Sequence, residues 1–507
     1  MQGIRPRAAV LLAFLGGALA LVAPAAAEPP APELVGVTPL GSDVQRFHYR
    51  YGPITVTPGQ NLILIGPVTI EKPGYPGYAI RIKPNLIRSD GSVPNVDVIH
   101  LHHAVWVNLS ARDLTRPSLP ERFFASGEEK TIARSPPGYG YYADPDDVWA
   151  VNHMLHNQTA APETVWITYD LDFVPADSRR GRRMKAVQPL WLDVRNGESY
   201  PVFDVLRGTG GRDRRLTYPA EARRPYGRDR RMNVWETNRR GTLVATAGHL
   251  HPGGLWTDLA VVRGRHSRRI FRSEAKYFDP SGPISWDLSM TASDRDWRVG
   301  LRRGDRLRIS ATYDTRRASW YESMGINVAW IAFGQRGPNP FRRRIDTRGR
   351  VTHGHLPENE NYGGRDQGAQ DPRRLPDGET VDDRVGIFGF QYTPGGMGLA
   401  GSIGNPPVVA PGEQLTFENG DWPLAGTMHS ITSCRAPCTG STGISYPLAN
   451  GPRIFDSGNL GYGPGGFTAA ANRSHWRTPK NLGPGTYTYF CRIHPFMRGA
   501  FRLKAGG

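Results

Sequence analysis

Short runs of apolar and β-branched residues, separated by turns rich in Pro and Gly, make up most of the chain. Clear examples are residues 61–65, 98–107 and 165–173. Runs of this length bounded by turn residues are typical of β-strands. The chain also contains 60 Gly and 44 Pro among its 507 residues, which argues against a helical bundle. The pattern therefore predicts an all-β protein.

The strand-like runs fall into three blocks, which agrees with the roughly three domains expected for a chain of this length. A short basic run at 178–185 and a polar, Pro- and Gly-rich stretch at 335–382 separate them. Within the second block, residues 208–231 are dense in Arg, Gly and Pro and predict a long exposed loop. The predicted division is a signal peptide at 1–27, β-sandwiches at 28–185 and 186–338, a linker at 339–382 and a third β-domain at 383–507.

The N-terminus indicates export. Arg5 and Arg7 precede an uncharged apolar run at 8–22, and three alanines at 25–27 form a small-residue cleavage site. No later run reaches the length of a membrane span. We therefore expect a secreted or extracytoplasmic protein without a transmembrane span. Removal of both arginines reduces the net charge from +17 to 17 − 2 = +15. The basic residues lack interleaved aromatics, so no nucleic-acid partner is expected.

Candidate metal chemistry is clearest near the C-terminus. Cys491, His494 and Met497 lie on one short segment, and His429 precedes them by about 60 residues. A Cys-His-His set with a weak axial Met suits blue copper, because thiolate and thioether favour Cu(I) while imidazoles retain Cu(II). The alternative is a buried structural Cys near an unrelated His and Met. Only three Cys occur, which excludes a four-thiolate site.

This segment resembles the cupredoxins, specifically the short Cys-x2-His-x2-Met loop of amicyanin-like members. The resemblance implies a Greek-key β-sandwich with a type 1 copper that transfers electrons. Cys434 and Cys438 are then predicted to form a short-loop disulfide, as an exported protein allows. Multicopper oxidases have His on both sides of the copper-binding Cys, whereas this chain has Phe490 and Arg492. A trinuclear copper cluster that receives electrons directly through these neighbours is therefore not expected.

Histidines also cluster in the first two blocks. In a strand, residues two apart face the same way, so His100 and His102 should share a face, and His103 should point to the other unless a bulge re-aims it. Further candidates follow at His153, His156, His249, His251 and Met324. Neutral imidazoles can hold copper without a negative ligand. Alternatively, each histidine cluster is a polar pair with a purely structural role, and Met324 packs in the core.

This layout resembles the copper type II, ascorbate-dependent monooxygenases, which consist of two tandem jelly-roll-like β-sandwiches. By position, the resemblance gives the electron-supplying copper to His102, His103 and His153, and the O2-binding, catalytic copper to His249, His251 and Met324. His100 and His156 are additional candidates for the first site. His353 and His355, in the predicted linker, are further candidate metal ligands. The disulfides typical of the animal members are absent, since these blocks contain no Cys.

The leading hypothesis is therefore an exported copper monooxygenase with a fused blue-copper domain. It would carry a type 1 copper and one or two type 2 coppers. Its partners would be O2, an unidentified small-molecule or peptide substrate, and an external donor such as an ascorbate-like reductant or redox protein. Two alternatives remain: a non-catalytic copper-binding or electron-transfer protein, and a nitrite-reductase-like or oxidase-like multicopper enzyme.

Overall fold

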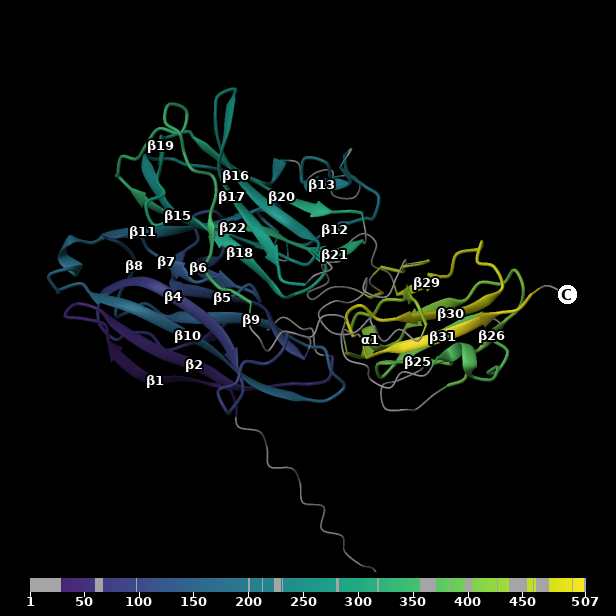
Figure 1. The fold of residues 1–507 in the computed structure, drawn as a ribbon. Helices are drawn as coiled ribbons and strands as arrows, with labels where there is room; N and C mark the ends of the chain where they lie inside the picture. Colours follow the sequence, from purple (N-terminus) through teal and green to yellow (C-terminus); the bar gives the residue numbers. More distant parts are fainter. Residues whose placement is uncertain are drawn as a thin grey trace, which may run out of the picture.

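The computed structural model describes residues 29–505 apart from a set of short gaps. These gaps are 60–66, 97, 199–200, 212, 223–228, 230, 280–281, 317–318, 356–370, 382, 397–403, 426, 437–453, 459, 462–473 and 495. The predicted signal peptide, the predicted strand at 61–65 and Cys438 lie outside the described residues. Almost all regular secondary structure of the described residues is β-strand, which confirms the all-β prediction. Figure 1 shows the strands gathered into three bodies.

The first body is a sandwich of two sheets. One sheet contains β3 (Val68–Thr69), β9 (Trp149–Asn157), β5 (Ile99–Arg112) and β6 (Pro120–Ser126), in that order. The other contains β1 (Ala31–Pro39), β2 (Gln45–Val56), β10 (Glu163–Pro175), β4 (Gly77–Ile87), β7 (Ala133–Arg134) and β8 (Tyr139–Ala143). Aromatic and branched side chains from both sheets, including Trp106 and Phe173, fill the space between them. This burial of apolar area stabilises the sandwich.

The second body repeats the architecture. One sheet contains β11 (Lys185–Asp193), β22 (Gly325–Phe333), β15 (Gly241–Leu250), β18 (Leu288–Ala292), β19 (Val299–Leu301) and β23 (Arg350–Val351). The other contains β13 (Arg215–Tyr218), β14 (Val234–Glu236), β20 (Arg306–Asp314), β16 (Gly254–Arg263) and β17 (His266–Tyr277). A separate ribbon pairs β12 (Phe203–Val205) with β21 (Trp320–Ser323).

The third body, at the C-terminus, is a sandwich of two four-stranded sheets. The first has the order β25 (Gln391–Thr393), β24 (Arg384–Phe388), β27 (Thr416–Asn419) and β29 (His475–Arg477). The second has the order β26 (Val408–Val409), β31 (Arg498–Leu503), β30 (Gly485–Phe490) and β28 (Thr432–Cys434). Helix α1 (Asp421–Ala425) follows β27. The chain also has single 3-10 turns at η1 (Gly181–Arg183) and η4 (Pro372–Arg374).

Strand β11 connects the first two bodies. Its residues 185–187 pair with β8 of the first sandwich, and its residues 188–193 pair with β22 of the second. The two bodies also share apolar packing, because Val244 and Trp330 of the second sandwich join the core of the first. The first two sandwiches are therefore packed against each other along this strand (Figure 1).

Two segments are more ordered than their composition indicates. The prediction that residues 208–231 form an exposed loop is wrong for β13, which hydrogen-bonds to β20. Its alternate residues Leu216 and Tyr218 are buried in the core of the second sandwich, and the surrounding Arg and Gly residues mask this short pattern. Within the predicted linker, Phe341 and Ile345 pack on the same core, and β23 adds to β18.

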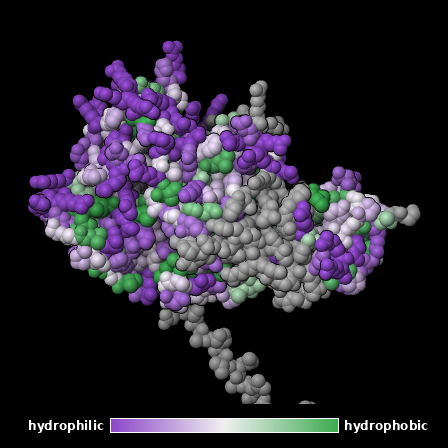
Figure 2. All heavy atoms as spheres, viewed as in Figure 1, coloured by the Kyte–Doolittle hydropathy of each residue, from purple (hydrophilic) through white to green (hydrophobic). Residues whose placement is uncertain are grey.

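The surface is predominantly hydrophilic on the face shown in Figure 2, with apolar side chains scattered among polar ones. Four large exposed apolar residues lie together in and next to β1, namely Leu34, Val35, Val37 and Leu40, whereas others such as Phe388 lie apart in the sequence. Among the described residues, no helix is both long and apolar enough to cross a membrane.

Candidate metal centres

The C-terminal body brings together three of its predicted ligands at one buried point. The Nδ1 atoms of His429 and His494 are 3.1 Å apart, and the Sγ of Cys491 lies 3.9 Å and 3.6 Å from them, respectively. With metal–sulfur and metal–nitrogen bonds of about 2.3 and 2.0 Å, a trigonal site requires roughly 3.7 Å for each sulfur–nitrogen pair and 3.5 Å between nitrogens. The observed triangle thus fits one metal ion with little adjustment.

The surroundings of this triangle fix its orientation. Asp421 accepts hydrogen bonds from the backbone N–H groups of Gly389 and Phe390, and its Oδ2 lies 2.9 Å from Nε2 of His429. The backbone N–H groups of Ser430 and His494 both point at the sulfur of Cys491, at 3.3 and 3.4 Å. Such hydrogen bonds and ring contacts hold a ligand in one rotamer and tune the bound metal.

Charge and burial act on these groups in opposite directions. Burial alone would raise the pKa of the Cys491 thiol, but its hydrogen bond to His429 lowers it below its usual value. For His429, burial lowers the pKa, yet the Asp421 carboxylate and the sulfur raise it overall. Burial lowers the pKa of His494 well below its usual range. The set therefore combines an activated thiol with two buried imidazoles, which is the donor chemistry a copper ion prefers.

The two remaining predictions in this body have mixed outcomes. Met497 is buried in the same loop, where its carbonyl oxygen accepts a hydrogen bond from Cys491 N–H at 3.0 Å. Its place as an axial ligand stays a prediction. Cys491 is a free thiol, whereas Cys434 is disulfide-bonded. The expected partner, Cys438, is outside the described part of the chain.

A β-bulge shapes the histidine cluster of the first sandwich. Strand β5 pairs with β9 in register up to Leu101, skips His102, and resumes at His103. A bulge of this kind turns a side chain out of strict alternation. His100 and His102 stack at 6.0 Å between ring centroids, and His103 lies edge-on to His102 at 5.4 Å. The bulge considered in the sequence analysis is present.

The histidines converge in two overlapping groups within which one ligand nitrogen per residue lies within 4.8 Å of the others. The first group is His100, His102 and His156, and the second is His102, His103 and His251. His251 comes from the second sandwich, so the cluster is shared between the first two bodies. This grouping differs from the expected one, because it combines His251 with histidines of β5 and places His153 in neither group.

Three histidines of the cluster are each anchored through one ring nitrogen. His100 uses Nδ1 on the carbonyl oxygen of Val96, His251 uses Nδ1 on that of Glu322, and His249 uses Nδ1 on the Glu129 carboxylate. The opposite nitrogen of each ring is buried and has no hydrogen-bond partner among the described residues. The same holds for Nδ1 of His103 and Nδ1 of His156. One anchored and one open nitrogen is the typical state of a metal-binding histidine.

Burial also favours the neutral form of five rings of the cluster. It lowers the pKa of His103 to about 3 and that of His156 to about 4. It lowers the pKa values of His100, His102 and His251 well below the usual range, with neighbouring histidines adding to the effect. A neutral imidazole has a free lone pair, so the cluster holds its nitrogens in the form that binds copper.

Three other predicted ligands lie apart from the two groups. His153 faces Tyr51 at 5.9 Å between ring centroids, and burial lowers its pKa to about 4. His355 pairs its Nδ1 with Asp287 at 2.9 Å, and the carbonyl oxygen of His353 accepts a hydrogen bond from Ser289. The predicted linker histidines are thus packed against the second sandwich.

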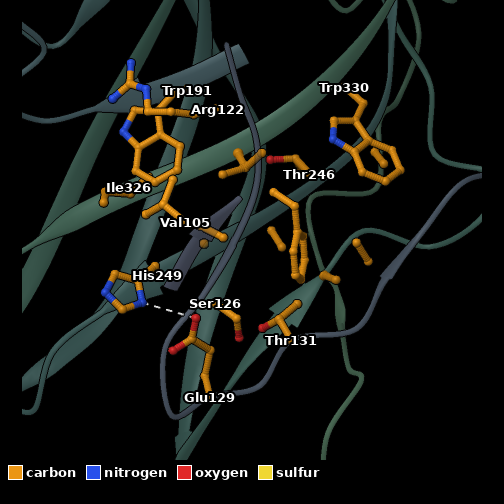
Figure 3. A pocket seen from close by; sticks show the side chains of 18 of the residues that line it. Val105, Arg122, Ser126, Glu129, Thr131, Trp191, Thr246, His249, Ile326 and Trp330 are labelled. Atoms are coloured by element: carbon orange, nitrogen blue, oxygen red, sulfur yellow. Dashed lines mark hydrogen bonds and ion pairs between the residues drawn. The ribbon is translucent and has the colours of Figure 1, made fainter. Parts of the chain in front are cut away.

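Next to the cluster lies a cavity of about 740 Å³ between the two sandwiches. Its wall includes His103, His249 and Met324, together with apolar residues such as Val105 and Trp330. Figure 3 shows His249 with its bond to Glu129, Val105 and Ile326 near His249, and Trp330 on the opposite side of the cavity. Met324 therefore faces the same space as two cluster histidines.

The C-terminal centre contacts the histidine cluster directly. Nε2 of His156 lies 2.7 Å from the carbonyl oxygen of Ile493, the residue before His494. Nε2 of His494 lies 2.7 Å from the carbonyl oxygen of Gly59 in the first sandwich. A Cβ at Gly59 would lie 2.4 Å from the ring of Phe390 and 2.8 Å from His494, and its φ is +64°, so this approach requires glycine. A three-histidine group thus adjoins the Cys491 site through Ile493, rather than through the neighbours of the cysteine.

Sequence reasoning missed several residues that shape the cluster. Glu129 orients His249, and its neighbours Glu128 and Lys130 form an ion pair of 3.0 Å that is almost wholly buried. Trp286 lies against His100 and His102, with ring centroids 4.8 and 4.5 Å away. The run of charged residues at 128–130 is typical of an exposed turn, so nothing in its composition indicates burial.

Comparisons with known proteins give only distant similarity. No family model and no curated protein matches the chain. Among solved structures, a mutant of amicyanin in its Cu(I) form is 18% identical, with 27% of this chain and 90% of that chain covered and a TM-score of 0.14. The Cu-containing nitrite reductase from Thermus scotoductus SA-01 is 15% identical over 52% of this chain and 55% of its own length, with a TM-score of 0.16.

A third similar structure is that of Sulfolobus Turreted Icosahedral Virus. It is 9% identical over 57% of this chain and 90% of that chain, with a TM-score of 0.22. Because all three TM-scores are far below 0.5, none of these similarities bears on what this chain binds or does.

Proposed function

We propose that this chain is an exported copper oxidoreductase in which the Cys491 centre delivers electrons to copper held by the histidine cluster. More specifically, we propose that the oxidoreductase is an O2-dependent monooxygenase. The observation that carries the proposal is the position of His156. One of its ring nitrogens bonds to Ile493 of the C-terminal loop at 2.7 Å, and the other is open within the cluster. The two candidate centres therefore meet at one side chain.

The donor sets suit different tasks. The thiol and two imidazoles of the C-terminal triangle are typical of a type 1 electron-transfer site. Copper bound at the histidine cluster would supply the one-electron chemistry that activates O2. The residues of the chain contribute imidazole nitrogens, held in place by Glu129 and by backbone carbonyls. The thioether of Met324, at the cavity wall, would favour Cu(I).

A short path connects the two centres. Ile493 is joined to His494 by a peptide bond. Nδ1 of His494 lies 3.6 Å from Sγ of Cys491. The carbonyl oxygen of Ile493 then accepts the hydrogen bond from His156. The rings of His156 and His494 are only 6.3 Å apart between centroids. Electron transfer would thus need one hydrogen bond and a few covalent bonds.

The cavity favours a monooxygenase over an oxidase. Reduction of O2 to water needs no organic substrate, whereas hydroxylation requires a space beside the metal for a C–H bond. The cavity of about 740 Å³ is large enough for a small organic molecule. Apolar side chains, including Val105, Phe124 and Ile326, form much of its wall and would exclude water. We therefore propose a substrate that is largely apolar.

A second candidate function rests on a different observation. The group of His100, His102 and His156 consists of histidines, and its member His156 contacts Ile493 of the C-terminal loop. A histidine-only centre supplied with electrons by a type 1 site would suit a nitrite reductase or oxidase. Nitrite turnover, or O2 uptake that needs no organic substrate, would favour this candidate.

The experiment is copper reconstitution of the full chain, followed by metal counting, visible and EPR spectroscopy, and reductant-dependent O2 uptake. We expect an intense thiolate-to-copper band that is lost in Cys491→Ser. We also expect Met324→Leu to lower reductant-dependent O2 uptake at least tenfold, because it removes the thioether. Met290→Leu is the matched control, since Met290 is equally buried but lies in the core of the second sandwich.

Two results would contradict the proposal. If the band persists in Cys491→Ser, the C-terminal assignment is wrong. If all sites fill with copper but no substrate or oxidant reoxidises the reduced protein, the chain is a non-catalytic copper carrier.

A further inference from the structure

His102 differs from the other histidines of the cluster at both ring nitrogens. Its side chain is 5% exposed, and neither Nδ1 nor Nε2 has a hydrogen-bond partner within the described chain. A neutral imidazole carries one N–H donor and one acceptor. Leaving both buried and unpaired costs about 1–3 kcal/mol for each group. His100, His156, His249 and His251 avoid part of this cost by anchoring one nitrogen, so His102 calls for a separate explanation.

His102 also occupies a special position among the candidate ligands. It is the single residue common to the two described groups, with His100 and His156 in one, and with His103 and His251 in the other. The bulge at His102 removes it from the strand pairing that fixes its neighbours. Its ring lies between the two groups, 6.0 Å from His100 and 4.7 Å from His251 between centroids.

We propose that His102 bridges two copper ions as an imidazolate, one ion on each side of its ring. One ion would bind His100, His156 and a nitrogen of His102, and the other would bind His103, His251 and the second nitrogen of His102. Formation of the bridge releases the N–H proton of the neutral ring to solvent, so charge and atoms balance. The inference rests on the proposed function only in taking copper as the metal.

The open nitrogens of the four partner rings support this arrangement. His100 and His251 present Nε2, while His103 and His156 present Nδ1, and each of these atoms is buried and unpaired in the described structure. Ions about 2.0 Å from each ligand nitrogen would satisfy them together with both nitrogens of His102. An N–H of His102 directed at the Trp286 ring, 4.5 Å away between centroids, would satisfy one nitrogen weakly and leave the other unpaired.

The test is a spin count on the oxidised, copper-reconstituted full chain. Two Cu(II) ions joined through an imidazolate couple antiferromagnetically and lose their ordinary EPR signals. We expect the EPR-detectable copper to fall short of the total copper by two ions per chain, while the Cys491 site keeps its own signal. In His102→Gln, this EPR-silent pair should disappear. The exposed His266 supplies the matched control, since His266→Gln should keep the silent pair.

Two outcomes would overturn the bridge. One is a wild-type protein in which all bound copper is EPR-detectable, as expected for isolated ions. The other is His102→Gln retaining the silent pair, which would mean that another group couples the ions. The thiolate-to-copper band shows in each variant that the C-terminal body has folded. The spin count is made on resting protein, so it tests the bridge independently of catalytic turnover. Failure of the bridge and failure of the proposed function can therefore be told apart.

Discussion

The buried histidines predict that the copper-free protein loses stability in mild acid. Burial lowers the pKa of His103 to about 3 and those of His153 and His156 to about 4. In the unfolded chain, the same rings titrate near 6.5. Below that pH, the histidines of the unfolded state bind protons, whereas those of the folded state stay unprotonated. Stability should therefore be full above pH 6.5 and should fall as the pH drops toward about 4.

The size of the effect follows from these three rings. Each pH unit below about 6.5 costs roughly 1.4 kcal/mol per histidine until the folded pKa is reached. At pH 5, this amounts to about 2 kcal/mol for each ring and about 6 kcal/mol for the three. A typical domain is stable by only about 5–15 kcal/mol. The first sandwich should therefore be marginal at pH 5 without metal.

The assay is thermal unfolding of copper-free and copper-loaded protein between pH 7.5 and 5, followed by tryptophan fluorescence. Trp106 and Trp149, both in the first core, report on the affected body. Copper-free protein should lose much of its thermal stability over this range. Copper-loaded protein should lose far less, because a coordinated nitrogen cannot take up a proton. Equal stability of the copper-free protein at pH 7.5 and pH 5 would refute the reasoning.

Three further variants test the contacts around the centres. Gly59→Ala places a Cβ at φ +64° against His494, which should cost about 1–3 kcal/mol and slow electron delivery, measured by stopped flow, while the thiolate band remains; an unchanged rate would contradict the docking. Glu129→Gln removes the negative charge beside Nδ1 of His249 and should weaken copper binding by about 10–100-fold in competition with a chelator. Unchanged affinity would exclude His249 as a ligand. Asp421→Asn should raise the type 1 reduction potential in a redox titration, because a negative charge that favours Cu(II) is lost; a lowered potential would contradict this role.

The sequence predicted the strand-rich architecture because alternation and turn residues are local signals. It likewise identified Cys491, His494 and His429, since two of these share one short loop and the third lies on a nearby strand-like run. Residues 208–231 show where composition fails to predict secondary structure. The four residues of β13 are too few to show a period among Arg and Gly, and only pairing with β20 orders them.

The grouping of the histidines could not be predicted, because it depends on tertiary contacts. The bulge at His102 turns side chains that strict alternation would separate, and no local residue marks it. His251 joins His102 only because the two sandwiches pack together. The contact of His156 with Ile493 spans 337 positions in the sequence. Neither composition nor spacing carries information about such contacts.

The most direct test of the proposed electron path is the reoxidation of the type 1 site in a single turnover. Fully reduced, copper-loaded protein is mixed with O2, and the thiolate-to-copper band is followed by stopped flow. The path through Ile493 and His156 predicts rapid recovery of the band in the wild type. It predicts recovery at least tenfold slower in His156→Leu, which removes both the hydrogen bond and a cluster ligand. Equal recovery rates in the two proteins would contradict electron delivery from Cys491 to the histidine cluster.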